Sequence, residues 1–170
     1  MRKFTVTKEV EWDMGHRVPN HKSKCRNPHG HRYRLLVEVE GPLVDDPDNS
    51  SEGMVIDFGD LKEVMKTQIH DLFDHGTLVY VGDKEVLDIY KIDSVSALDR
   101  IEGVDPGNWV VKLDNTLHNW NLSVSSFVPT AENLAAFIFG RMSNLLNKGE
   151  VRVKRVHLYE TPTSMATYGD

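Results

Sequence analysis

The sequence predicts a single α+β domain over residues 1–170, and three observations support this prediction. Apolar and polar residues alternate near both ends of the chain, as they do in half-buried strands. Two longer segments repeat apolar residues every three or four positions, as amphipathic helices do. The chain of 170 residues is long enough to bury a core without disulfides, and its single cysteine has no partner within the chain.

Two strands are expected near the N-terminus, at residues 4–16 and 31–40. In each segment apolar residues occupy most of the alternate positions that point to one side, which predicts one buried face. His16 ends the apolar row of the first segment, and His29 and His31 precede the row of the second. If the two strands pair antiparallel, the end of the first meets the start of the second.

Helices are expected at residues 59–73 and 131–147, each with an apolar stripe. Asp57 or Asp60 would cap the first helix, and Pro129-Thr130 would begin the second. Between them, residues 76–128 contain the strand-like pieces TLVYV, VLDIYKI and WVVKLD. So long a connection is expected to have hairpins of its own.

The last strand is expected at residues 151–161. Its apolar parity shifts between Val153 and Val156, which predicts a bulge or burial on both faces.

Composition and charge exclude several classes of protein. The net charge of −6 argues against general binding to nucleic acid or membranes. The N-terminus lacks the apolar region of a signal peptide, and no apolar run approaches the roughly 20 residues that span a bilayer. One cysteine suits a reducing compartment, so a cytoplasmic protein is expected.

A basic segment stands out against this acidic background. Residues 14–37 hold no acid but six Lys or Arg and four His, while the rest of the chain has 14 Lys or Arg against 26 acids. Such a segment is a plausible receptor for a small polyanion, although a solvated loop would have the same composition.

The expected strand pairing brings His16, His29 and His31 together. Residues two apart in a strand point the same way, so His29 and His31 can face one ion. Three neutral imidazoles suit Zn²⁺ and leave a fourth position for water or substrate, as a catalytic site requires. The alternatives are three polar loop histidines, or a different third ligand such as His21 or His118.

Each of the other candidate residues has two possible roles. Cys25 lies among Lys and Arg, which favour the thiolate that acts as nucleophile or base, but it could equally be a fourth zinc ligand. Asp74 could orient His75 as a general acid or base, or His75 could simply end a helix. Glu160 could accept hydrogen bonds from the guanidine-like edge of a heterocycle, or it could be a glutamate exposed to solvent.

Six segments together carry a resemblance to a known family: DMGHRV, CRNPHGHRY, MVIDFGDLK, FDHG, PTAENLA and YETPTS. In this order they resemble the 6-pyruvoyltetrahydropterin synthase-like family over residues 1–76 and 127–168. The C-x3-H-x-H spacing followed by DFGDLK is most similar to the 6-carboxytetrahydropterin synthase branch of queuosine biosynthesis. Segment 76–128 is longer than the usual connection, and FDHGTLV differs from the commoner LDHxxLN, so a reshaped pocket near His75 is expected.

The resemblance implies the tunnelling fold. That fold is a four-stranded antiparallel sheet with two helices packed on one face, here with an extended insertion at 76–128 between the helices. Trimers close the sheets into a barrel and often stack as hexamers. Active sites then lie between subunits.

The resemblance also implies a set of residue roles. His16, His29 and His31 would bind Zn²⁺, Cys25 would be the catalytic general base, and Asp74 and His75 would complete the proton relay. Glu160 would anchor the pterin ring, helped by Thr130 and Glu132.

The implied reaction converts 7,8-dihydroneopterin triphosphate to 6-carboxy-5,6,7,8-tetrahydropterin and releases acetaldehyde and triphosphate. The basic segment would then receive the triphosphate of the substrate. The alternatives are a 6-pyruvoyltetrahydropterin synthase, which eliminates triphosphate only, and a non-catalytic zinc-containing oligomer that binds pterin.

Overall fold

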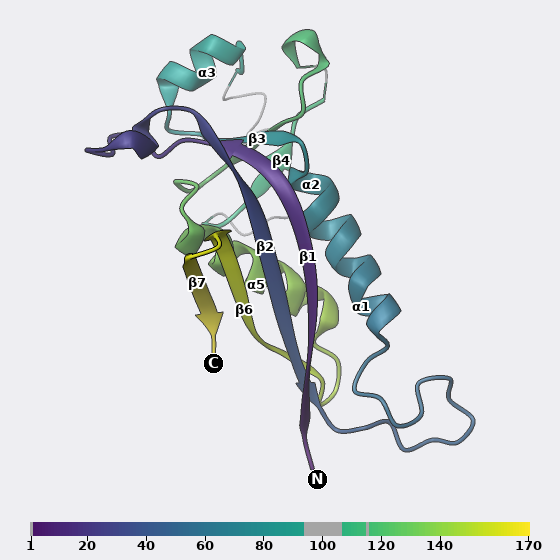
Figure 1. Cartoon of the computed structure of the whole chain (residues 1–170). Coiled ribbons are helices and arrows are strands. Elements are labelled where there is room, and N and C mark those ends of the chain that lie inside the picture. Colours follow the sequence, from purple (N-terminus) through teal and green to yellow (C-terminus); the bar gives the residue numbers. More distant parts are fainter. Residues whose placement is uncertain (1, 94–106, 115) are drawn as a thin grey trace.

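The computed structural model describes residues 2–93, 107–114 and 116–170. Its strands form one seven-stranded mixed sheet in the order β4-β5-β3-β1-β2-β6-β7 (Figure 1). The strands are β1 (Phe4–His16), β2 (His29–Gly41), β3 (Gly76–Tyr80), β4 (Val110–Lys112), β5 (Leu122–Ser125), β6 (Arg152–Thr161) and β7 (Ser164–Gly169).

The first helical segment runs without a break through α1 (Phe58–Met65), a π-helical turn (Lys66–His70) and α2 (Asp71–Phe73). Its buried residues are spaced by four: Leu61, Met65, Ile69 and Phe73. In an ideal α-helix that spacing drifts by about 40° per step. The wider π turn reduces this drift, which helps to keep all four side chains on the sheet.

Two further helices are described, α3 (Lys84–Tyr90) and α5 (Ala131–Leu146). Side-chain caps begin the helices as the sequence predicts: Asp57 accepts from Gly59 and Asp60 at α1, and Thr130 accepts from Asn133 at α5. The core lies between the sheet and the segment α1–α2 together with α5. Phe73 joins these layers, since its ring contacts both Trp12 of β1 and Phe137 of α5.

The expected sheet of four antiparallel strands with two helices is wrong for this chain. Seven strands are present in the described residues, β3 runs parallel to both β1 and β5, and α3 is a third helix. Alternation predicts which face of a strand is buried but not its partner. The short apolar strands after residue 76 bury themselves by extending the sheet beyond β1, where the chain emerges from α2.

Segment 76–128 also differs in detail from its prediction. TLVYV and WVVKLD contain strands β3 and β4, but VLDIYKI lies mostly in α3, because Asp83 caps this segment as a helix by accepting from Val86. β4 and β5 pair antiparallel, and they join the main sheet instead of forming a separate hairpin. Residues 94–106 and 115 of this predicted insertion lie outside the described residues.

The C-terminal strand confirms the predicted bulge. β6 pairs with β2, and the register shifts between Glu38 and Val39, so that Val153 faces Val39 while Arg155 faces Glu38. Lys154 is the extra residue. β7, which the sequence analysis missed, continues the sheet beyond β6.

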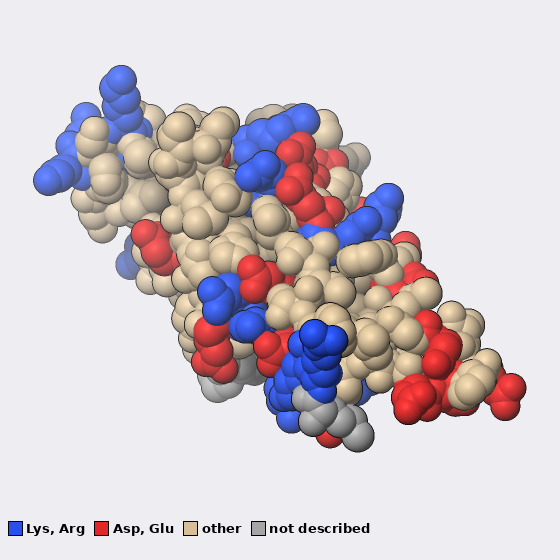
Figure 2. Space-filling view, turned by 60° about the horizontal axis from the view of Figure 1, so that its bottom comes forward, with Lys and Arg blue, Asp and Glu red and all other residues tan. Residues whose placement is uncertain are grey.

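Charge is distributed toward the two ends of the molecule. Figure 2 shows acidic side chains gathered at one end, where the loop after β2 carries the exposed residues Asp45, Asp46, Asp48 and Glu52. Lys and Arg protrude at the opposite end, near the 3₁₀ turn Lys24–Arg26. Within the part of the chain that the structure describes, no helix is long and apolar enough to cross a membrane.

Candidate active site

Three histidines meet where β1 ends and β2 begins. The two strands pair antiparallel over their whole length, which sets His16 opposite His29 and Met14 opposite His31. The ring centroid of His16 lies 4.6 Å from that of His29 and 5.4 Å from that of His31. One possible ligand atom from each histidine lies within 4.8 Å of the other two. The predicted juxtaposition is therefore confirmed.

Backbone carbonyls orient two of these rings. His16 Nδ1 lies 2.7 Å from the Pro129 carbonyl oxygen, and His29 Nδ1 lies 2.8 Å from that of Asn27. A carbonyl only accepts, so each Nδ1 carries a proton, and in the neutral imidazole Nε2 then keeps its lone pair for a metal. Burial lowers the pKa of His16 and of His31, although the Pro129 carbonyl opposes this for His16.

Three imidazoles in their neutral form fit a divalent metal ion such as zinc, and three protein ligands leave a fourth position for an oxygen ligand. Neither alternative third ligand belongs to the group: among the described residues, the cluster able to hold an ion is His16, His29 and His31. His21 accepts from the backbone of Ser23, and the ring of His118, in the 3₁₀ turn Leu117–Asn119, contacts Trp120 just after that turn.

Tyr33 is a buried member of the site that the sequence analysis missed. Its hydroxyl donates to Glu160 Oε1 at 3.3 Å and lies 3.3 Å from His16 Nε2. Burial, together with the Glu160 carboxylate, raises the pKa of Tyr33 well above its usual value. Tyr33 occupies the same alternate positions as His29 and His31, so the sequence predicts that it lies on the same face of the strand. It was assigned to the apolar core because the residues that follow it on that face are apolar.

A cavity of about 230 Å³ opens beside the histidines, and we call it the polar cavity because ionisable side chains form part of its otherwise mixed lining. His16 and His29 line it together with four predicted site residues, namely Cys25, Thr130, Glu132 and Glu160. Glu160 Oε1 lies 3.5 Å from His16 Nε2. Cys25 shares this cavity but is not part of the three-histidine group. The arrangement can hold a polar ring against Glu160 while a thiol faces the same space.

Asp74 and His75 lie elsewhere in the chain. They follow α2, and the His75 Nδ1 donates to Asp74 Oδ2 at 2.8 Å, while Asp74 Oδ1 accepts from the Asp13 amide at 3.2 Å. Partial burial raises the pKa of Asp74, but these hydrogen bonds outweigh it and leave that pKa below its usual value. The His75 side chain is 80% exposed.

The Asp74–His75 pair therefore faces a different space from Cys25. His75 lines an open cavity with His31 and Arg32, whereas Cys25 lines the polar cavity with His16 and His29. Within one chain the predicted relay residues are not brought into one cavity.

The basic segment is only partly available to an anion. Arg17 is held by Asp83 and Glu85, and Arg32 by Asp13. Lys22, Lys24 and Arg26 are exposed and make no ion pair with any described residue, so the positive charge of this segment is concentrated in the loop around Cys25.

The chain is similar to known proteins over nearly its whole length. A family model described as 6-pyruvoyl tetrahydropterin synthase matches residues 5–170. The chain is 32% identical over 166 residues to the 6-carboxy-5,6,7,8-tetrahydropterin synthase of Haemophilus influenzae, covering 97% of this chain and 98% of that relative.

Two solved structures show the same fold. An uncharacterized protein from Wolinella succinogenes has a TM-score of 0.70 at 21% identity, covering 100% of this chain and 99% of that one. The 6-pyruvoyl tetrahydropterin synthase of Caenorhabditis elegans has a TM-score of 0.60 at 22% identity, covering 100% and 97%.

The family match spans nearly the whole chain, and the curated relative exceeds 30% identity over almost all of both proteins. The resemblance seen in the sequence motifs is therefore confirmed, as is the expectation of an enzyme. The chain belongs to the 6-pyruvoyl tetrahydropterin synthase family.

Proposed function

We propose that this protein is a zinc-dependent 6-carboxytetrahydropterin synthase. It converts 7,8-dihydroneopterin triphosphate to 6-carboxy-5,6,7,8-tetrahydropterin, with release of acetaldehyde and triphosphate, as an early step of queuosine biosynthesis. The observation that carries the proposal is the three-histidine group beside a cavity that also holds Cys25 and Glu160. The near full-length similarity to a relative named for this reaction supports the choice of product.

Glu160 anchors the pterin in this proposal. A carboxylate can accept two parallel hydrogen bonds from the guanidine-like edge of the ring. Its position is fixed by the hydroxyl of Tyr33, and Thr130 and Glu132 line the same cavity. The pterin side chain would then point toward His16 and His29, and its triphosphate toward the exposed cations Lys22, Lys24 and Arg26.

The proton transfers are assigned to Cys25 and His75. A zinc ion bound by the three histidines would supply Lewis acidity to the side-chain hydroxyls of the substrate. Cys25 takes a proton from the side chain, and His75, held by Asp74, exchanges protons as general acid and base. Because these residues line different cavities of one chain, we assign a complete site to the interface of two subunits in a trimer or hexamer.

The deciding experiment incubates the zinc-loaded full chain with 7,8-dihydroneopterin triphosphate and identifies the products by mass spectrometry. We expect 6-carboxytetrahydropterin and acetaldehyde in equal amounts. A 6-pyruvoyl product without acetaldehyde would refute the product assignment, and binding without turnover would favour a non-catalytic pterin-binding oligomer.

Cys25→Ala tests the role of the thiol separately from that of the metal. We expect turnover to be lost while zinc content is unchanged, because Cys25 is not part of the three-histidine group. Ser23→Ala, two residues earlier and exposed, is the matched control and should keep both properties. Loss of zinc in Cys25→Ala would instead make Cys25 a ligand.

Two further proposals concern the whole chain. We assign it to the cytoplasm, where one free cysteine stays reduced. Within the single domain 1–170 we regard residues 76–128 as an insertion that contributes its own strands to the sheet.

A further inference from the structure

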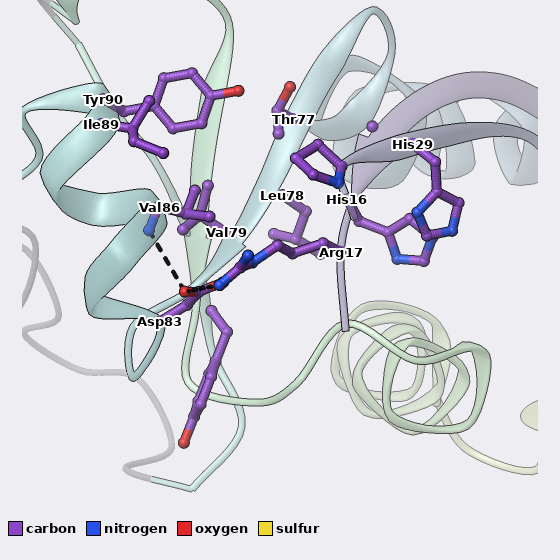
Figure 3. Close-up of a pocket in the computed structure, with 13 residues that line it drawn as sticks. His16, Arg17, His29, Thr77, Leu78, Val79, Asp83, Val86, Ile89 and Tyr90 are labelled. Atoms are coloured by element: carbon purple, nitrogen blue, oxygen red, sulfur yellow. Dashed lines mark hydrogen bonds and ion pairs between the residues drawn. The ribbon is translucent and has the colours of Figure 1, made fainter. Parts of the chain in front are cut away.

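A second, mostly apolar cavity of about 150 Å³ lies beside the three histidines. Figure 3 shows it between α3, strand β3 and the end of β1. α3 contributes Val86, Ile89 and Tyr90, and β3 contributes Leu78 and Val79. Most residues that line this cavity therefore come from segment 76–128, whereas none of the three histidines does.

This apolar cavity touches the metal group directly. His16 and His29 line it, and among the described residues they are the two that it shares with the polar cavity that holds Glu160 and Cys25. A ligand that reaches the histidines can therefore extend into a second space, distinct from the one proposed for pterin.

An ion pair fixes the position of α3 relative to the histidines. Arg17, the residue after His16, donates from Nε to Asp83 Oδ2 at 2.5 Å and from Nη2 to Asp83 Oδ1 at 2.7 Å. Asp83 is buried, and it also caps α3 by accepting from the Val86 amide at 3.4 Å. Figure 3 shows this chain of contacts from β1 to α3.

The same ion pair limits what the cavity can bind. The guanidinium of Arg17 is already neutralised by Asp83, and Glu85 accepts from it as well at 2.8 Å. The lining therefore offers no unpaired positive charge to a phosphate. Apart from this ion pair, the two histidines and Thr77, the side chains that line the cavity are aliphatic or aromatic.

We propose that the apolar cavity is a ligand subsite for a short aliphatic group carried by an oxygen ligand of the metal. The inference rests on the metal-binding part of the proposed function, not on its pterin product. The oxygen head binds at the fourth position of the metal, and the aliphatic tail lies between α3 and β3, where Ile89 and Tyr90 cover it.

The test compares acetohydroxamate with hexanohydroxamate, which share a metal-binding head and differ by four methylenes. Their affinities for the zinc-loaded full chain are measured by calorimetry, and for the cobalt-loaded chain by visible absorption. We expect hexanohydroxamate to bind more tightly, by about fourfold for each methylene that enters the cavity. Equal affinities would overturn the proposal.

A bulky substitution shows where the tail goes. Ile89 is 63% exposed, so Ile89→Trp should fold, fill the mouth of the cavity and abolish the preference for hexanohydroxamate while acetohydroxamate binds as before. The matched control is Leu145→Trp in α5, at a residue that is 41% exposed and lines none of these cavities. A preference that survives in Ile89→Trp would place the tail elsewhere and refute the subsite.

A second variant acts in the opposite direction. Tyr90→Ala lengthens the cavity and should let octanohydroxamate bind more tightly than it does to the unaltered chain. Failure of the metal itself to bind would overturn the proposed function together with the subsite. Metal and acetohydroxamate binding without any effect of tail length would overturn the subsite alone.

Discussion

Replacing Phe73 by Ala probes the contact that joins α2 to the sheet beside the site. The Phe73 side chain is 1% exposed, and its ring centroid lies 5.9 Å from that of Trp12 and 6.3 Å from that of Phe137. Truncating a buried Phe costs about 3–5 kcal/mol, depending on how far the site can collapse. Trp12 also stacks on Tyr33 with centroids 5.6 Å apart, so it cannot move far to fill the space.

We therefore expect a loss near the middle of that range, about 4 kcal/mol. This corresponds to about three powers of ten in the unfolding equilibrium. The free energy of unfolding is measured by urea titration at fixed zinc and protein concentrations, because both metal and subunit association stabilise the folded state. Since Asp74 and His75 directly follow Phe73, the variant should also lose turnover more steeply with temperature.

Phe58→Ala is the matched control, because the Phe58 side chain begins α1 and is 51% exposed. Its loss should stay within about 0.5 kcal/mol, as for most surface substitutions. If Phe73→Ala lost less than about 2 kcal/mol, the core there would be able to collapse. The argument that stacked rings hold α2 against β1 would then be refuted.

Four further predictions concern the site and its surroundings. Burial raises the pKa of Tyr33, so its contribution to stability is present below about pH 10, the ordinary pKa of tyrosine, and is lost as the pH rises above it. In Tyr33→Phe the free energy of unfolding should decrease less as the pH becomes alkaline. A decrease as steep as that of the unaltered chain would refute this role of Tyr33. His31→Ala should weaken zinc binding at least about 100-fold in chelator competition, whereas His21→Ala should leave it unchanged. Removal of zinc should leave a folded but inactive oligomer by circular dichroism and sizing, and unfolding would mark the metal as structural. Arg17→Met should destabilise the fold by about 3 kcal/mol, because the carboxylate of Asp83 would stay buried without its cationic partner. Adding Asp83→Asn should recover part of that loss in thermal melts, and no recovery would show that the pair does not act as a unit.

Much of the site could be predicted from periodicity. Residues of one parity in a strand share a face, so the rows that end in His16 and begin at His29 had to meet once β1 paired with β2. The helix caps at Asp57 and Thr130 and the bulge in β6 were local signals of the same kind. Each depends on residues close in sequence or on a single strand pairing.

In segment 76–128 prediction from local periodicity failed. VLDIYKI looks like a strand by composition, but the buried carboxylate of Asp83 pairs with Arg17 and caps the segment as a helix. Arg17 precedes Asp83 by 66 residues, a separation that no local pattern encodes.

Periodicity in the sequence was enough to predict β1, β2 and β6, two helices and the three candidate metal ligands, because side-chain periodicity follows directly from backbone geometry. The tertiary structure alone decided the parallel pairing of β3 and the carbonyl that orients His16. It also decided that Cys25 and His75 line different cavities and that an apolar cavity lies beside the histidines. These features join segments far apart in the chain, and their partners are chosen by packing and by the pairing of buried polar groups.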